Sequence, residues 1–139
     1  MDGKVPGVNF VSDSFLRARL QRRVAEICGR KGGNFPGSQP VSITRENMHF
    51  LVERRYRVSW KADGVRYLML IEGPSKVYLF DRDNTPFLAP NLKFPHAKST
   101  PQQERHVENT LVDGEMILDQ VNGVDVPRFL IYDIVLFEV

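Results

Sequence analysis

The sequence contains almost no cysteine and no long apolar run, and each absence excludes a class of protein. Its 139 residues include a single cysteine, Cys28, so a disulfide framework and a thiolate metal site are excluded. No stretch approaches the ~20 consecutive apolar residues of a membrane helix. No basic segment followed by an apolar one opens the chain as a signal peptide would. We therefore expect an intracellular protein with no membrane partner.

The net charge and the positions of the histidines say little more about the class of protein. The net charge of +2 is too small to indicate nucleic-acid binding, and it does not exclude such binding. The three histidines lack the spacing of metal ligands; they are His49, His96 and His106. With 42% hydrophobic and 26% charged residues, the composition is that of a globular protein whose length fits one domain or part of one.

The first half of the chain predicts a loop, a helix and a connector. Residues 1–11 are broken by glycine and proline, and Ser12-Asp13-Ser14 then caps a helix that stops at Gly29. One face of this helix is apolar and the other carries four arginines, read as a solvated face or, alternatively, as a contact for RNA or an acidic partner. A Gly/Pro-rich connector at 32–40 precedes a short helix capped by Thr44.

From residue 55 onward the apolar period switches to two, which is typical of strands. The pattern predicts five strands, at residues 55–61, 66–72, 76–82, 111–119 and 128–137, with an irregular loop at 84–108. Asn122-Gly123 indicates a two-residue hairpin. The fold class is therefore α+β, an antiparallel-rich sheet with an N-terminal helix. The last strand is apolar and has no polar tail, so we expect a domain cut short at Val139.

Lys61 stands at the end of an alternating apolar run, directly before Asp63-Gly64 and five residues before Arg66. Lysine is rarely found in such a half-buried position, and its pKa falls readily when it is buried or placed near other cations. A neutral amine is a nucleophile that forms covalent intermediates. The spacing therefore predicts an attacking amine aimed by a tight turn, although an Asp-Gly pair after a strand is more often only a turn.

Charged residues also interrupt the other predicted strands, at Asp81-Arg82, Asp113, Glu115 and Asp133. Asp113 and Glu115 share one face of a strand, where two carboxylates are costly unless they are partnered. Arg66 and Arg82 are the candidate partners. This set of cations and acids on one side of a sheet predicts a site for a polyanion with hydroxyl groups, such as a nucleotide.

The chemistry of the side chains assigns the roles. Lys61 would attack the α-phosphorus of a nucleoside triphosphate, forming a phosphoramidate and expelling pyrophosphate. Arg66 and Arg82 would lower the pKa of the amine by like-charge proximity and bind phosphate or ribose oxygens. Glu115 would accept hydrogen bonds from ribose hydroxyls or help to hold a divalent cation.

Each residue also has a purely structural interpretation. Arg82 alone would be a surface salt-bridge partner, Asp113-Gly114 a bulge, and Asp133 the acceptor for a backbone amide. Ordinary burial preference places Tyr132 and Phe137 in the core rather than in a base-stacking role. Cys28, on the apolar face of the helix, fits a small core residue.

In order, these segments resemble the covalent nucleotidyltransferase superfamily of polynucleotide ligases and mRNA capping enzymes. Residues 61–66 look like its motif I, residues 111–117 like motif III and residues 129–135 like motif IIIa. The resemblance is closest to the guanylyltransferase of metazoan capping enzymes. It covers almost the whole chain and is strengthened by the stretches at 35–42, 58–64, 80–84 and 126–128.

The resemblance implies a ligase-like (ATP-grasp-like) domain in which Lys61 takes GMP from GTP and passes it to the 5′-diphosphate end of RNA. It assigns Arg66, Arg82 and Glu115 to the sugar and phosphates, places Asp63 in the GTP site, and stacks Tyr132 on guanine. It further implies Mg²⁺ or Mn²⁺ as cofactor, a nuclear location and the RNA polymerase II tail as a partner. The metal ligands are not assigned.

The chain departs from the family pattern at both ends. Motifs IV and V, the OB-fold domain and the N-terminal phosphatase domain of animal capping enzymes are missing from residues 1–139. We therefore expect the N-terminal part of a nucleotidyltransferase domain, inactive or very weak alone. The alternatives are a fragment of an ATP-dependent polynucleotide ligase and a non-catalytic short isoform.

Overall fold

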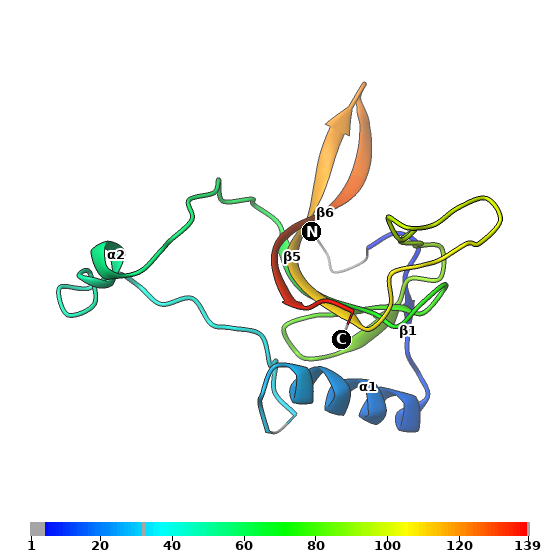
Figure 1. Cartoon of the computed structure of the whole chain (residues 1–139), viewed down its shortest axis with the longest axis horizontal. Helices are drawn as coiled ribbons and strands as arrows, with labels where there is room; N and C mark the ends of the chain where they lie inside the picture. Colours follow the sequence, from blue (N-terminus) through cyan, green and yellow to red (C-terminus); the bar gives the residue numbers. More distant parts are fainter. Residues whose placement is uncertain (1–4, 32, 139) are drawn as a thin grey trace.

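The fold combines an antiparallel sheet with a few helices, as the sequence predicts (Figure 1). The computed structural model describes residues 5–31 and 33–138. Its six strands run in the order β1-β4-β3-β2-β5-β6, and all neighbouring strands are antiparallel. The elements are β1 (Asn9–Phe10), α1 (Ser14–Ile27), α2 (Phe50–Glu53), β2 (Val65–Ile71), β3 (Val77–Phe80), β4 (Pro86–Leu88), β5 (Thr110–Val121) and β6 (Val124–Leu136).

Helix α1 begins and ends where its sequence predicts. The Asp13 side chain accepts a hydrogen bond from the Leu16 amide at 2.8 Å, which satisfies one of the unpaired donors of the first turn. At the other end, the chain leaves the helix at Gly29, whose φ is +63°. The amide of Arg30 then reaches back to the carbonyl of Ala25 at 2.9 Å, which closes a Schellman motif.

Two of the four arginines on the polar face of α1 hold the helix to the rest of the protein. Arg19 donates two hydrogen bonds to Glu72, at 2.9 and 2.8 Å, and Arg23 donates one to Asn109. These contacts attach α1 to the end of β2 and to the start of β5. Arg19 and Arg23 therefore help to anchor the helix, a role that neither the solvated face nor the RNA contact predicted for these arginines includes.

Both faces of the central strand β2 are buried, because its side chains alternate between two apolar clusters. Leu68 and Leu70 pack against Leu20 and Val24 of α1, and Cys28 lies at the edge of this cluster, as predicted. On the opposite face, the buried side chains are Tyr67, Met69, Ile71, Val77, Leu79, Ala89, Val112 and Met116, covered by segments near residues 5–8 and 94–107. No helix within the described ranges is long and apolar enough to cross a membrane.

The strand predicted at residues 55–61 is wrong. This segment has no strand assignment, and every residue from 54 to 61 is exposed. It belongs to an arm that carries α2 and extends away from the sheet (Figure 1). The predicted cap is wrong as well, because α2 begins after His49 rather than Thr44. An alternating pattern specifies a strand only when a neighbouring strand is present to pair with it.

Two short strands occur where the sequence predicts loops. Strand β4 lies inside the segment 84–108, and it pairs with both β3 and β1, the latter lying inside residues 1–11. Pro86 opens β4, a position that requires no amide donor from it, and its carbonyl accepts from the Val11 amide at 3.2 Å. Strands of two and three residues are too short for a period-two pattern to reveal.

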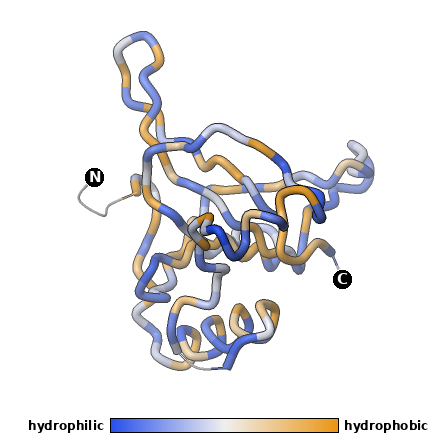
Figure 2. The backbone as a smooth tube through the Cα atoms, turned by 90° about the vertical axis from the view of Figure 1, so that its left-hand side faces the viewer, coloured by the Kyte–Doolittle hydropathy of each residue, from blue (hydrophilic) through white to orange (hydrophobic). Residues whose placement is uncertain are grey.

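The predicted hairpin at Asn122-Gly123 is confirmed. Both residues have positive φ, 51° and 77°, as a tight turn between twisted strands requires. Its strands are longer than predicted, and Figure 2 shows hydrophobic and hydrophilic residues mixed along the projecting hairpin. Among the described residues, β6 lies at one edge of the sheet and pairs only with β5.

Candidate active site

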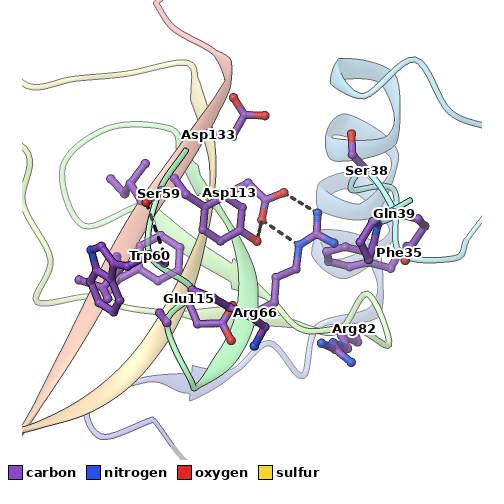
Figure 3. A pocket seen from close by; sticks show the side chains of 17 residues that line it. Phe35, Ser38, Gln39, Ser59, Trp60, Arg66, Arg82, Asp113, Glu115 and Asp133 are labelled. Carbon is purple, nitrogen blue, oxygen red and sulfur yellow. Dashed lines mark hydrogen bonds and ion pairs between the residues drawn. The ribbon is translucent and has the colours of Figure 1, made fainter. Parts of the chain in front are cut away.

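An open cleft of about 1130 Å³ lies at the point where the α1 face of the sheet turns from apolar to polar. On β2 the row Leu70, Leu68 continues into Arg66, and on β5 Leu111 is followed two residues later by Asp113. Both polar side chains line the cleft (Figure 3). Its other charged lining residues are Lys61, Arg82, Glu115 and Asp133, and its aromatic ones are Phe35, Trp60, Phe129 and Tyr132.

The structure brings together five of the six residues predicted for the site. Lys61, Arg66, Arg82, Glu115 and Tyr132 all line the cleft, whereas Asp63 does not. The half-buried setting expected for Lys61 is wrong, because its side chain is exposed at the cleft wall. The roles assigned to these residues remain predictions.

The loop that carries Lys61 is seated on β5 by a close approach at Gly64. A Cβ atom at this position would meet the Met116 carbonyl oxygen, and it would lie 2.8 Å from Cγ2 of Ile117. The obstruction at Met116 is backbone, which cannot rotate away. The Asp-Gly pair therefore does more than turn the chain, because the missing side chain lets the loop lie directly against the neighbouring strand.

Arg66 on β2 and Asp113 on β5 form an ion pair joined by two hydrogen bonds. Arg66 Nε lies 3.0 Å from Oδ1 of Asp113, and Nη2 lies 2.6 Å from Oδ2. The guanidinium carbon also lies 5.0 Å from the centre of the Phe35 ring (Figure 3). The hydrogen bonds to Asp113 raise the pKa of Arg66, so its charge is fixed. Of the two arginines predicted as partners of the β5 carboxylates, Arg66 is the one that pairs with Asp113.

Tyr132 approaches the same carboxylate from β6. Its hydroxyl donates a hydrogen bond of 2.8 Å to Oδ1 of Asp113. Burial of this end of the side chain, followed by the hydrogen bond to Asp113, raises the pKa of Tyr132 to about 12. The core positions predicted for Tyr132 and Phe137 are wrong, since these residues are 52% and 54% exposed.

Arg82 projects from a turn that its neighbours shape. Asp81 Oδ1 accepts from the amides of Asp83 at 3.0 Å and of Thr85 at 2.9 Å, which closes the chain after β3. Arg82 therefore lies in the turn, so the prediction that it ends the strand at 76–82 is wrong, and its side chain is exposed.

Asn84 anchors this turn to two other parts of the chain. It is fully buried. Its side-chain Nδ2 donates to the Gly33 carbonyl at 3.0 Å, and its backbone carbonyl accepts from the side chain of Gln21 of α1 at 2.7 Å. Sequence reasoning assigned no role to Asn84. A short polar side chain that tolerates positive φ, here 59°, is the only signal it offers.

Asp113 and Glu115 face the cleft together, as predicted, although the strand between them is irregular. The pairing of β5 with β6 shifts register between Asp113 and Gly114, which confirms the expected bulge. Gly114 is required there because an added Cβ would lie 2.6 Å from the Leu130 carbonyl oxygen. Asp133 accepts from the Ile134 amide at 2.9 Å, the backbone contact predicted for it.

The cleft contains residues that sequence reasoning did not assign to the site. Phe35, Ser38, Gln39 and Pro40 come from the Gly/Pro-rich connector after α1, a stretch that supported the family resemblance but to which no site residue was assigned. Asp113 was recognised as a charged strand residue and was not assigned to the site. Its signal was a carboxylate within an apolar strand, which burial would force into partnership with a cation.

Charge in the cleft is balanced, with three cationic and three anionic side chains in its lining. Among the residues that the structure describes, no group of three or more His, Cys, Asp or Glu side chains could hold a metal ion. A cleft with forked arginine donors, an exposed lysine and carboxylates has the chemistry of a site for phosphorylated, hydroxyl-bearing ligands.

Comparisons with known proteins identify the family. All residues 1–139 match the family model of the mRNA capping enzyme, catalytic domain. The chain is 48% identical over 133 residues to an mRNA-capping enzyme of Danio rerio, and 44% identical over 141 residues to one of Caenorhabditis elegans. These alignments cover 96% and 99% of this chain and 22% of each relative. An mRNA-capping enzyme subunit alpha of Neurospora crassa is 37% identical over 138 residues, covering 93% of this chain and 33% of that protein.

The chain belongs to the mRNA capping enzyme catalytic domain family. It spans about a fifth of the length of the animal relatives that it matches. The family match agrees with the resemblance found in the sequence, and it favours the capping enzymes over the ATP-dependent ligases.

Proposed function

We propose that this chain is the N-terminal part of the nucleotidyltransferase domain of an mRNA guanylyltransferase, with Lys61 as the nucleophile that carries GMP. The single observation that supports this most is the placement of Lys61, Arg66, Arg82 and Glu115 around one cleft. These side chains come from three separate segments of the sequence, and their chemistry fits a nucleoside triphosphate. The proposed domain is of the ligase-like type, with these residues as its N-terminal part.

In the first step, the Lys61 amine, after losing a proton to solvent, attacks the α-phosphorus of GTP. The N–P bond forms, the bond from the α-phosphorus to the bridging oxygen breaks, and pyrophosphate leaves with the electron pair. In the second step, a terminal oxygen of a 5′-diphosphate RNA attacks the same phosphorus. The N–P bond breaks, the amine regains a proton, and GMP is joined to the RNA end.

The other cleft residues would bind and orient the nucleotide. Arg66 and Arg82 present forked N–H donors suited to phosphate oxygens, and Glu115 accepts from ribose hydroxyls. The exposed ring of Tyr132 offers a surface on which guanine can stack. Asp63 lies outside the cleft lining, and its proposed contact with GTP is the least supported of this set.

A divalent cation, Mg²⁺ or Mn²⁺, is part of the proposal because the lining charges of the cleft already balance one another. A nucleoside triphosphate brings several negative charges that this lining does not neutralise. Glu115 is the lining carboxylate that would share such an ion with substrate phosphates, which is the usual way in which Mg²⁺ is held. When bound, the ion would neutralise charge on the phosphates and on departing pyrophosphate.

The proposed partners follow from the same function. They are GTP and the 5′-diphosphate end of RNA, with the RNA polymerase II tail as a protein partner and the nucleus as the location.

The test is covalent labelling with radioactive GTP and a divalent cation. We would assay the 139-residue chain and a graft in which it replaces the matching segment of the Danio rerio relative. The expected result is label from GTP on the graft, lost in Lys61→Ala and retained in the matched control Lys76→Ala, whose lysine is exposed outside the cleft. The isolated chain is expected to label weakly or not at all.

Two other outcomes would contradict the proposal. Label from ATP in preference to GTP would indicate a polynucleotide ligase. A graft that folds but takes no label from either nucleotide would indicate a non-catalytic protein.

A further inference from the structure

The buried carboxylate of Asp113 joins two side chains that reach the cleft from opposite directions. Asp113 is 3% exposed, and its oxygens accept three hydrogen bonds. Two come from Arg66 on β2, and the third comes from Tyr132 on β6. Because β5 lies between these two strands, Asp113 is the only residue of the three that is adjacent to both.

The contacts of Arg66 fix the direction of its guanidinium. Two of its five N–H donors are directed at Asp113, and its guanidinium carbon lies 5.0 Å from the centre of the Phe35 ring. An interaction with the Tyr132 side chain also contributes to the raised pKa of Arg66, and the guanidinium lines the cleft. Arg66 can therefore bind an anion without releasing Asp113.

Tyr132 is anchored at its hydroxyl end. Its hydroxyl donates to Oδ1 of Asp113, the same oxygen that accepts from Nε of Arg66. The rest of the side chain is half exposed along the cleft. A rotation of the Asp113 carboxylate would therefore change the position of the guanidinium and the position of the phenol ring together.

We propose that Asp113 is a positioning residue that couples Arg66 to Tyr132, so that the hydroxyl of Tyr132 helps to set the anion-binding geometry of Arg66. This rests on the proposed function in taking the anion to be the phosphate chain of a nucleotide. The coupling itself is a property of the unliganded chain.

The competing interpretation is that Asp113 only neutralises a partly buried arginine. The variant that separates the two is Tyr132→Phe, which removes one hydroxyl and leaves the Arg66–Asp113 pair in place. If Asp113 has only a neutralising role, loss of this hydroxyl will leave the hydrogen bond from Arg66 Nε–H to Asp113 unchanged. If Asp113 couples the two residues, that hydrogen bond will weaken.

The first measurement is the hydrogen-exchange rate of the Arg66 Nε–H group by NMR on the whole 139-residue chain. The resonance is assigned by its disappearance in Arg66→Lys. We expect about tenfold faster exchange in Tyr132→Phe, because a hydrogen bond to a charged group is lost from the shared carboxylate oxygen. Tyr56→Phe is the matched control, since Tyr56 is exposed and lies outside the cleft. An unchanged rate in Tyr132→Phe overturns the proposal.

The second measurement uses inorganic tripolyphosphate, a probe that has phosphates and no base. We expect Tyr132→Phe to weaken its binding by about 3- to 10-fold, and Tyr56→Phe to leave it unchanged. A tyrosine that acted only by stacking on a base would not affect this probe. Equal binding by the unsubstituted chain and Tyr132→Phe, or no binding to the unsubstituted chain, would overturn the proposal.

The proposed function can fail separately from this coupling. Absence of GTP label on the graft, with a changed Arg66 exchange rate in Tyr132→Phe, would reject guanylyltransferase activity and retain the coupling. Label on the graft with an unchanged exchange rate would do the reverse.

Discussion

Arg66 and Asp113 face one another across neighbouring strands, with Nε–Oδ1 and Nη2–Oδ2 distances of 3.0 and 2.6 Å. Their side chains are 13% and 5% exposed, so both charges are largely removed from water. The two residues are far apart in the sequence. The pair exists because β2 and β5 are adjacent in the sheet, and it stands at the floor of the cleft.

Breaking this pair should be costly. Asp113→Ala leaves the Arg66 charge without its partner, and we expect the free energy of unfolding to fall by about 3 kcal/mol, measured by urea denaturation. The control is Asp119→Ala, which removes the partner of Arg128 from an ion pair whose side chains are 45% and 49% exposed. That change should cost less than about 1 kcal/mol. Similar losses in the two variants would contradict the burial argument.

Gly64→Ala should disturb the loop that carries Lys61. The new methyl group would overlap the Met116 carbonyl oxygen, and such overpacking typically costs about 1–3 kcal/mol. Thermal unfolding measures this loss. Gly33→Ala is the matched control, because a Cβ at Gly33 meets no atom within 4 Å. If the two variants unfold at the same temperature, the loop does not rest on β5 as described.

Asn84 should stabilise the folded chain through both its side-chain amide and its backbone conformation. Asn84→Gly removes the hydrogen bond to the Gly33 carbonyl and keeps a residue suited to a φ of 59°. Asn84→Ala removes the same bond and adds left-handed strain of about 1 kcal/mol or more. We therefore expect both variants to unfold at lower urea concentration than the parent chain, with Ala lower than Gly. The reverse order would exclude backbone strain as a factor.

Tyr132 should make stability depend on alkaline pH. Burial and the hydrogen bond to Asp113 raise the pKa of Tyr132 from 10.0 to about 12, so the folded chain holds this proton more tightly than the unfolded chain does. The stabilisation is fully present below pH 10 and is lost as the pH rises toward 12. Titration of phenolate absorbance should show that Tyr132→Phe removes a component near pH 12. Removal of a component near pH 10 instead would show that the hydroxyl is free.

Chelation of divalent cations should abolish labelling of the graft by GTP. The cleft lining carries equal numbers of cationic and anionic side chains, so the charge of the triphosphate needs an added cation. We expect the rate of labelling to fall by at least about 100-fold with EDTA and to return with Mg²⁺ or Mn²⁺. The rate is measured by radioactive incorporation. Undiminished labelling in EDTA would rule out the metal part of the proposal.

Local sequence signals predicted the elements whose specification is short-range. The Asp13 cap, the end of α1 at Gly29 and the Asn122-Gly123 turn are fixed by side chains and φ preferences within a few residues. The strands containing residues 66–71 and 77–80 were found because their side chains alternate between two buried faces. The arm at 55–61 shows the limit of this method, because alternation alone does not supply a pairing partner.

The sequence by itself determined which chemical groups are present and where the chain turns, since both depend on residue type and nearest neighbours. It identified Lys61, two arginines and the β5 acids as the reactive set. Only the tertiary structure decided that Asp113 belongs with Arg66 and Tyr132, that Asn84 secures the turn of Arg82, and that Asp63 lies outside the cleft. Those relationships depend on which strands are neighbours and on how far each side chain is removed from water, and no local pattern encodes either quantity.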